Sequence, residues 1–176
     1  RTGIRKMIIW INGPYGVGKS SLAEKLHNME PESFIFDAEL VGNAVRDNMP
    51  KELFNGYIFE GYPLWFTLCS ALLADITQRY AEDIYVPMTL VYPDSFEKIR
   101  RPLEERGISV RHILLESSYD LIHDRILARG EAEGCWCMRH IHLCLQNQKD
   151  FKNVTRIRSF GKSVSELAVE VKEAIV

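Results

Sequence analysis

The most constraining feature of the sequence is the octapeptide Gly-Pro-Tyr-Gly-Val-Gly-Lys-Ser at residues 13–20. It places the required glycines, lysine and hydroxyl residue at the spacing of the pattern G-x-x-x-x-G-K-[ST]. The apolar residues 7–11 before it indicate a buried strand, and residues 21–26 after it indicate a helix. Between a strand and a helix, this pattern forms a loop whose backbone N–H groups and helix dipole bind phosphate oxygens. The octapeptide therefore predicts a nucleotide-phosphate site, against the alternative of a glycine-rich turn with a purely structural use.

The residues of this phosphate loop have separate expected roles. Lys19 is expected to reach the β- and γ-phosphates, and the Ser20 hydroxyl is expected to bind Mg²⁺. The other residues expected to bind the nucleotide are Gly13, Tyr15, Gly16, Val17, Gly18 and Ser21.

Length, composition and charge restrict the class of protein further. The 176 residues, 46% of them hydrophobic, suit a single domain over residues 1–176. A net charge of −2 argues against a nucleic-acid partner, which usually requires a basic face. No apolar run spans a bilayer, no signal peptide precedes the loop, and four cysteines lack a regular framework, so a cytoplasmic location is expected. Residues 1–6 precede Met7 and are set aside as a tag remnant or a frayed terminus.

Apolar runs alternate with helical patterns along the rest of the chain. Strands are expected over residues 6–12, 34–36, 84–91, 110–115 and 154–157. Helices are expected over residues 21–28, 39–47, 63–80, 95–106, 117–129, 136–151 and 163–175, with residues 48–62 irregular. Capping boxes are expected at Ser117 and Ser163, and Pro102 is expected to kink its helix or to open a second turn. The alternation predicts an α/β P-loop NTPase fold: a five-stranded parallel sheet with helices on both faces and a helical lid at about 125–140.

The sequence lacks the further motifs of a switch GTPase. No aspartate is followed by glycine at the third place, and residues 147–150 carry the letters of N-K-x-D in the wrong order. A motor or transporter ATPase would need a longer chain. What remains is a small kinase, or a binding protein that uses the kinase fold.

Candidate acceptor-binding residues follow the strand expected at 34–36, because ligands of parallel sheets gather at the carboxyl ends of strands. Asp37 is expected to hold Mg²⁺ through water or to accept the hydroxyl proton, with Glu39 beside it; helix N-capping by Asp37 is a compatible alternative. Arg46 is expected to clamp the acceptor, against the alternative of a solvated surface arginine. Trp65 is expected to stack on a ring or a sugar, against the alternative of a core tryptophan.

Two features mark the expected lid. Arg125 and Arg129 lie one helical turn apart, just before the glycine-flanked residues 130–134, and are expected to neutralise the phosphates on closure. The alternative is a solvated charged face. The Cys- and His-rich residues 135–144 lack a C-x-x-C pair, so we expect apolar packing of the thiols rather than a zinc site.

Four segments together resemble one known family. They read IIWINGPYGVGKS (8–20), DAELVG (37–42), YPLW (62–65) and VPMTLVYPDSF (86–96), and they resemble the bacterial tunicamycin resistance protein and its relatives. More distantly, the layout resembles nucleoside-monophosphate, shikimate and gluconate kinases and chloramphenicol phosphotransferase. The resemblance implies ATP as the nucleotide and resistance to the nucleoside antibiotic tunicamycin. In the distant relatives an aspartate after the second strand contacts acceptor and metal, which implies this role for Asp37.

Three functions fit the sequence. The first is an ATP- and Mg²⁺-dependent phosphotransferase acting on a small hydroxylated molecule such as a tunicamycin-like nucleoside, with Lys19, Asp37, Arg125 and Arg129 as catalytic residues. The second is an ATP-binding protein that sequesters the antibiotic without chemistry, and the third is a nucleotide or metabolite kinase. Membrane association is not expected, because the chain stops at Val176, before the extension that the resemblance links to membranes. The sequence leaves the oligomeric state and the choice between ATP and GTP open.

Overall fold

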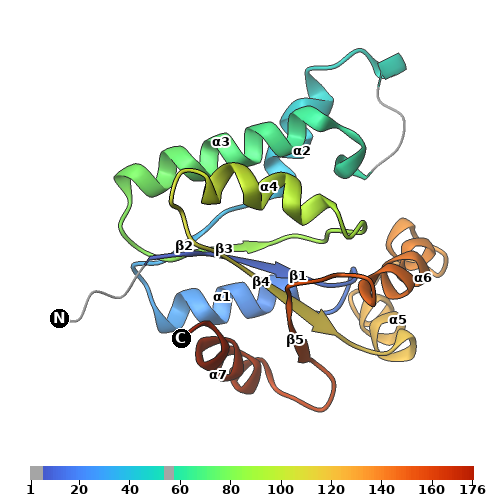
Figure 1. Cartoon of the computed structure of the whole chain (residues 1–176). Coiled ribbons are helices and arrows are strands. Elements are labelled where there is room, and N and C mark those ends of the chain that lie inside the picture. Colours follow the sequence, from blue (N-terminus) through green and yellow to red (C-terminus); the bar gives the residue numbers. More distant parts are fainter. Residues whose placement is uncertain (1–5, 54–57) are drawn as a thin grey trace.

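The fold is built around a parallel β-sheet, shown in the computed structural model, which describes residues 6–53 and 58–176 (Figure 1). In this part of the chain five strands form one sheet in the order β2-β3-β1-β4-β5. The strands are β1 (Ile8–Asn12), β2 (Phe34–Ile35), β3 (Ile84–Pro87), β4 (Val110–Glu116) and β5 (Thr155–Arg158). The helices are α1 (Lys19–Met29), α2 (Ala38–Asp47), α3 (Pro63–Arg79), α4 (Ser95–Glu104), α5 (Tyr119–Ala128), α6 (Trp136–Gln148) and α7 (Val164–Ile175). Two short 3₁₀ turns are η1 (Lys51–Leu53) and η2 (Phe59–Gly61). The predicted α/β fold is confirmed.

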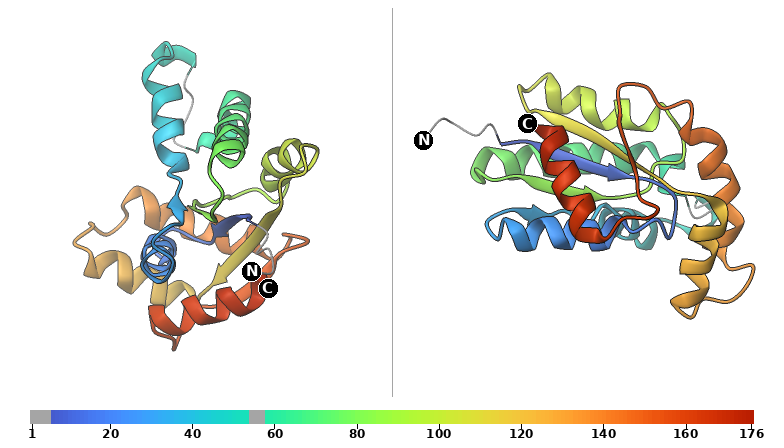
Figure 2. Two further views of the ribbon diagram at one scale, coloured as in Figure 1. Left: turned by 90° about the vertical axis from the view of Figure 1, so that its left-hand side faces the viewer. Right: turned by 90° about the horizontal axis from the view of Figure 1, so that it is seen from below.

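The central strand β1 is buried on both faces, and its side chains alternate between two cores. Ile8 and Trp10 contribute to a core covered by α3 and α4, whereas Ile9 and Ile11 contribute to a core covered by α1 and α7 (Figure 2). Burial on both faces explains why the strand is a continuous apolar run in the sequence.

Helices α5 and α6 form a separate small core at the carboxyl ends of the strands (Figure 1). Ile122 and Ile126 of α5 pack with Met138 and Ile141 of α6. The residues expected to form a lid, 125–140, span the end of α5, the connection and the start of α6. The lid region is therefore packed on itself rather than inserted into the main core.

The strand expected over residues 84–91 ends at Pro87. The Met88 N–H still bonds the Ile11 carbonyl oxygen of β1 at 3.1 Å, but the amides of residues 90 and 91 bond side chains. The N–H of Leu90 bonds Asn12 Oδ1 at 2.7 Å, and the N–H of Val91 bonds Glu60 Oε2 at 2.7 Å. The chain thus leaves the sheet where these two side-chain acceptors replace a carbonyl partner.

The helix ends agree with the sequence to within two residues, except that α6 ends at Gln148 and not at the expected residue 151. The capping box of Ser163 is present, but α5 is capped by Ser118, whose hydroxyl accepts the Leu121 N–H, and not by Ser117. Helix α4 continues past Pro102 without a second turn, although it ends two residues earlier than expected.

Parts of two expectations concern residues outside those described. They are residues 1–5, set aside as a tag remnant or frayed terminus, and residues 54–57 of the stretch expected to be irregular. Lys6 is described, and its Nζ donates to the carbonyl oxygen of Thr77 at 2.6 Å. No helix in the described ranges combines the length and the apolarity needed to cross a membrane.

Candidate active site

The phosphate loop joins β1 to α1, and its glycines are required by its geometry. Gly16 has φ of 83°, and a Cβ at this position would lie 2.8 Å from the Ile126 side chain of the lid region. Gly18 has φ of 105° and precedes α1, and no side chain caps this helix. The N–H groups of the first turn are therefore available for an anion at the positive end of the helix dipole.

Lys19 lies over this loop, and among the residues described no carboxylate forms an ion pair with it. Its Nζ donates to the carbonyl oxygens of Gly13 at 3.1 Å and Pro14 at 3.0 Å. Burial lowers the pKa of Lys19 to about 8, because desolvation disfavours the ammonium form. Two neutral carbonyls leave most of the positive charge uncompensated, so this position favours a bound anion.

A cavity of about 520 Å³ opens beside Lys19, and we call it the phosphate cavity. Arg125 lines it from α5, and Arg129 lines it from the residue that follows this helix. The Arg125 Nη1 donates to the Val17 carbonyl at 3.0 Å, while Arg129 forms an ion pair with Glu131 at 2.8 Å. The structure thus brings both arginines to the cavity that contains Lys19. Ser20, Ser21 and the remaining loop residues from Tyr15 to Gly18 line the same cavity.

A second cavity of about 300 Å³ adjoins the first, and we call it the side cavity. Tyr15, Glu39, Thr89 and Cys137 line both cavities, so the two share a wall. The other residues of the side cavity come from α2, from η2 and the residue before it, from the segment after β3, and from the start of α6: Asn43, Arg46, Ile58, Phe59, Glu60, Met88 and Trp136.

The predicted acceptor residues differ in where they lie. Glu39 lines both cavities and Arg46 lines the side cavity, with its Nε donating to Asp47 Oδ1 at 3.0 Å. Asp37 lines neither cavity. Its Oδ1 accepts the N–H groups of Glu39 and Leu40 at 2.9 and 3.3 Å, which caps α2. The structure therefore shows the capping role of Asp37 and places Glu39 at the cavity wall.

Trp65 does not present a stacking surface, which corrects the expectation that it contacts a substrate. It is fully buried, and its indole Nε1 donates to the Ala38 carbonyl oxygen at 2.9 Å. The expected alternative, a core tryptophan, is what the structure shows. The indole at the side cavity belongs instead to Trp136 of α6, whose ring packs edge-on against Tyr15 at 4.8 Å between centroids.

Asn12 and Thr89 are structural supports of the phosphate loop that sequence reasoning missed. Asn12 Oδ1 accepts the N–H groups of Gly13 and Leu90, both at 2.7 Å. The Thr89 hydroxyl donates to the Gly13 carbonyl at 2.9 Å. Residues 86–96, one of the four segments that resemble the family, thus hold the phosphate loop in place through Thr89 and Leu90. The available signal was Asn12 itself, a polar residue that closes an apolar strand.

Two buried titratable groups complete this support. Glu60 accepts the N–H groups of Val91 and Tyr92 at 2.7 and 3.0 Å, and burial raises its pKa against the effect of these bonds. His112 Nε2 lies 3.2 Å from Asn12 Nδ2. Because the Asn12 oxygen already accepts two N–H groups, we assign Nδ2 as donor and Nε2 as acceptor. Burial lowers the pKa of His112 to about 3, which keeps this ring neutral.

Comparison with known proteins identifies the class of fold. A family model described as an AAA domain matches residues 8–139. The chain belongs to this family. The structure is similar to the tunicamycin resistance protein of Deinococcus radiodurans, with a TM-score of 0.80, 27% identity, and coverage of 97% of this chain and 96% of that chain. The resemblance predicted from the sequence is thus confirmed.

Small-molecule kinases share the fold of this AAA domain. A gluconokinase from Sinorhizobium meliloti 1021 has a TM-score of 0.63 and 15% identity, covering 94% of this chain and 89% of that chain. A shikimate kinase from Acinetobacter baumannii, solved in complex with shikimate, has a TM-score of 0.59 and 18% identity, covering 97% and 93%. At these identities the likeness concerns the fold alone. No curated protein sequence matches the chain.

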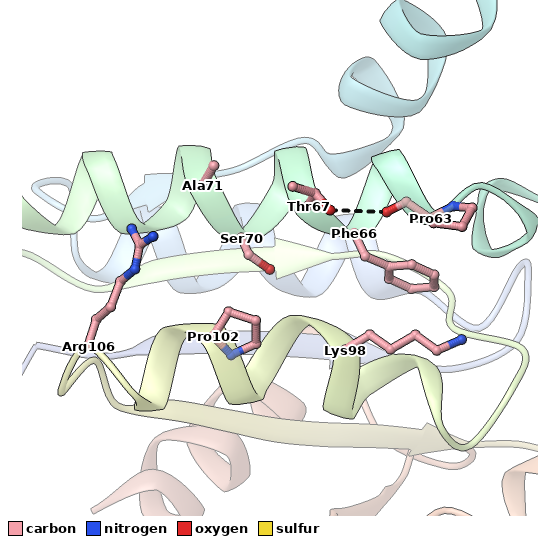
Figure 3. A pocket seen from close by; sticks show the side chains of 8 residues that line it. All are labelled: Pro63, Phe66, Thr67, Ser70, Ala71, Lys98, Pro102 and Arg106. Atoms are coloured by element: carbon pink, nitrogen blue, oxygen red, sulfur yellow. Dashed lines mark hydrogen bonds between the residues drawn. The ribbon is translucent and has the colours of Figure 1, made fainter.

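Two further features of the chain bear on ligands. A groove of about 430 Å³ lies between α3 and α4, lined by these helices and by Arg106 (Figure 3). None of its lining residues belongs to the phosphate loop, α2 or the lid region, so it is separate from the candidate active site. Within the described ranges, no group of three or more His, Cys, Asp or Glu side chains is placed to hold a metal ion, and the four cysteines are free thiols.

Proposed function

We propose that this protein is an ATP- and Mg²⁺-dependent phosphotransferase that acts on a hydroxyl group of a small molecule. The supporting observation is the wall shared by the phosphate cavity and the side cavity. Phosphoryl transfer requires the donor and the acceptor to be held side by side and in line. A cationic cavity that adjoins a second one of the size of a small ligand meets this requirement.

The residues of the phosphate cavity fit a nucleoside triphosphate. The uncapped start of α1 offers N–H groups, and Lys19 forms no ion pair with a carboxylate in the described part of the chain. Arg125 and Arg129 would stabilise the charge on the transferring group from the other wall. We infer that the residues predicted from the loop motif, Gly13 to Ser21, hold the nucleotide.

Mg²⁺, when bound, would neutralise charge on the β- and γ-phosphates. We propose the Ser20 hydroxyl as its direct ligand, because this residue lines the phosphate cavity. The acidic residue that meets the metal through water would be Glu39 or Asp37, which are two residues apart. Glu39 is favoured because it lines both cavities.

The acceptor hydroxyl must lose a proton to a carboxylate that faces it. We assign this role to Glu39, since Asp37 uses one carboxylate oxygen to cap α2. Asp37 remains the alternative that the resemblance implied. Arg46 would orient the acceptor from the side cavity, which it lines.

Tunicamycin is the first acceptor to test, because the structure resembles a protein named for resistance to it. The protein is incubated with tunicamycin, ATP and Mg²⁺, with a Lys19→Ala variant as control, and the drug is weighed by mass spectrometry. A gain of one phosphoryl group that is absent with the variant supports the proposal.

Two other outcomes point to the alternatives. Unchanged tunicamycin that binds in an ATP-dependent manner by calorimetry would favour sequestration without chemistry. Unchanged tunicamycin that does not bind, together with ADP formation on another hydroxyl compound, would favour a nucleotide or metabolite kinase.

A further inference from the structure

We infer that the side cavity accepts an uncharged, hydroxyl-bearing compound and discriminates against acceptors that carry a phosphate or a carboxylate. The inference rests on the proposed function, because it names the chemical class of the acceptor at that site. The inferred class includes free sugars and nucleosides, and it excludes the anionic acceptors of nucleotide kinases and sugar-acid kinases.

The charges around the side cavity carry the argument. Among its described lining residues the charged side chains are Glu39, Glu60 and Arg46. The single cation, Arg46, already forms an ion pair with Asp47 at 3.0 Å. The side cavity therefore has one cation and two carboxylates in its lining, and a third carboxylate, Asp47, pairs with that cation. An anionic acceptor would therefore meet a lining with more carboxylates than cations.

The surrounding sequence supplies no further cation to this wall. Between Lys51 and Arg79 the chain contains no lysine or arginine, and this stretch includes the residues of η2 that line the cavity. On the opposite wall, α6 contributes Trp136 and Cys137, which are uncharged side chains. Recognition of a phosphate or carboxylate normally relies on arginine or lysine clusters, with paired, charge-assisted hydrogen bonds. The side cavity has no such cluster among the residues described.

The same residues suit an uncharged polyhydroxyl compound. Carboxylates accept hydrogen bonds from hydroxyl groups, and the Asn43 amide and Thr89 hydroxyl can both donate and accept. Trp136 and Phe59 add aromatic surface for the apolar face of a sugar or a base. These features together match a neutral sugar or nucleoside rather than its phosphate.

The test compares matched pairs that differ only by charge: uridine with uridine 5′-monophosphate, and N-acetylglucosamine with N-acetylglucosamine 6-phosphate. Binding of each is measured by calorimetry with Mg²⁺ and AMPPNP present, so that no transfer is needed for a signal. We expect the neutral member of at least one pair to bind about tenfold or more tightly than its phosphate, with a difference that shrinks as salt rises. Tighter binding of a phosphorylated member, or no binding by either neutral compound, overturns the inference.

Charge-removing variants show whether the named carboxylates cause the preference. Glu39→Gln and Asp47→Asn, the latter releasing Arg46, should each narrow the ratio of affinities about threefold or more. Asp75→Asn is the matched control, because Asp75 pairs with Arg79 on the exposed face of α3 and lines neither cavity. A ratio that neither Glu39→Gln nor Asp47→Asn moves contradicts the inference.

Transfer assays with labelled ATP distinguish this inference from the proposed function. Preferential binding of a neutral compound without transfer would support the preference for uncharged acceptors and contradict the proposed phosphotransferase activity. Transfer to a phosphorylated acceptor would support the phosphotransferase activity and contradict the preference for uncharged acceptors.

Discussion

The phosphate cavity and the side cavity share a wall but are built in different ways. The residues that define the phosphate cavity include the contiguous loop 15–21, and its lining has four cations, Lys19, Arg125, Arg129 and Lys162, against two carboxylates. The side cavity is assembled from α2, η2, the segment after β3 and α6, and its lining has one cation against two carboxylates. The net charge of the lining residues is therefore positive in the phosphate cavity and negative in the side cavity, although the two cavities share a wall.

The two cavities are held in shape by different kinds of interaction. The phosphate loop is held by local backbone conformation and by buried hydrogen bonds from Asn12 and Thr89. The side cavity depends on how separate segments pack, with Glu60 anchoring the segment after β3. A change in the loop should therefore remove chemistry, whereas a change in the side cavity should alter which acceptor is used.

The largest effect is expected from Lys19→Ala, which removes the cation closest to the expected phosphates. Phosphoryl transfer should fall about a thousandfold, in line with the loss of one preorganised group that stabilises transition-state charge. The rate is measured as ADP formed with saturating acceptor. Lys25→Ala, on the same helix but outside both cavities, is the control and should keep its activity. A Lys19→Ala variant that keeps about a tenth of the original rate would contradict the proposed role of Lys19 in phosphoryl transfer.

The next effect is on stability, and it tests the support of the loop. Asn12→Ala leaves the buried N–H groups of Gly13 and Leu90 without their acceptor, which should lower the free energy of unfolding by about 3 kcal/mol. Urea denaturation measures this loss. Asn28→Ala, on the exposed side of α1, should change stability by less than about 0.5 kcal/mol. Equal stability of the two variants would show that Asn12 does not brace the loop.

The phosphate cavity could be predicted because the residues that define it are close together in the sequence. The spacing of Gly13, Gly18, Lys19 and Ser20 specifies a loop between a strand and a helix, and Arg125 and Arg129 follow from helical spacing near the lid. The alternating apolar runs likewise predicted the order of strands and helices. These features depend on local conformation, which neighbouring residues largely determine.

The side cavity was not predictable in the same way, because distant residues meet there only after folding. Glu60 lies in a stretch expected to be irregular, and nothing in its neighbours indicates that it binds the amides of Val91 and Tyr92. Trp65 and Trp136 show the same limit. Position alone suggested the first for substrate contact, yet packing of α3 on the sheet buries it, and the second lines the cavity.

Glu39 lies at the wall that the two cavities share, whereas Asp37, two residues before it, lines neither cavity. Glu39→Gln should reduce the turnover number about a hundredfold, because it removes the proposed proton acceptor. Asp37→Asn should retain most activity and lose at most about 1 kcal/mol of stability, because asparagine is also a good N-cap. Steady-state kinetics and urea denaturation of both variants decide between them. A larger loss of activity in Asp37→Asn than in Glu39→Gln would assign the catalytic role to Asp37.

The smallest effect is a dependence of nucleotide affinity on pH. Burial lowers the pKa of Lys19 in the free protein to about 8, and phosphates placed beside it should raise that pKa in the complex. Lys19 is therefore charged in both states below pH 8, and AMPPNP should bind with constant affinity there. Above pH 8 binding must take up a proton, so affinity should fall with rising pH, by up to about tenfold per pH unit.

Calorimetry between pH 7.5 and 9.5, in buffers of different ionisation enthalpy, measures both the affinity and the proton taken up. Burial raises the pKa of Cys144 to about 11, the pKa of Tyr15 further upward, and the pKa of Cys137 above its ordinary value. Lys19→Arg is the matched variant: arginine stays charged to above about pH 12, so its affinity should stay flat. An equal decline in the variant would assign the titration to another group. A flat profile in both proteins would mean that Lys19 is not the buried cation that meets the phosphates.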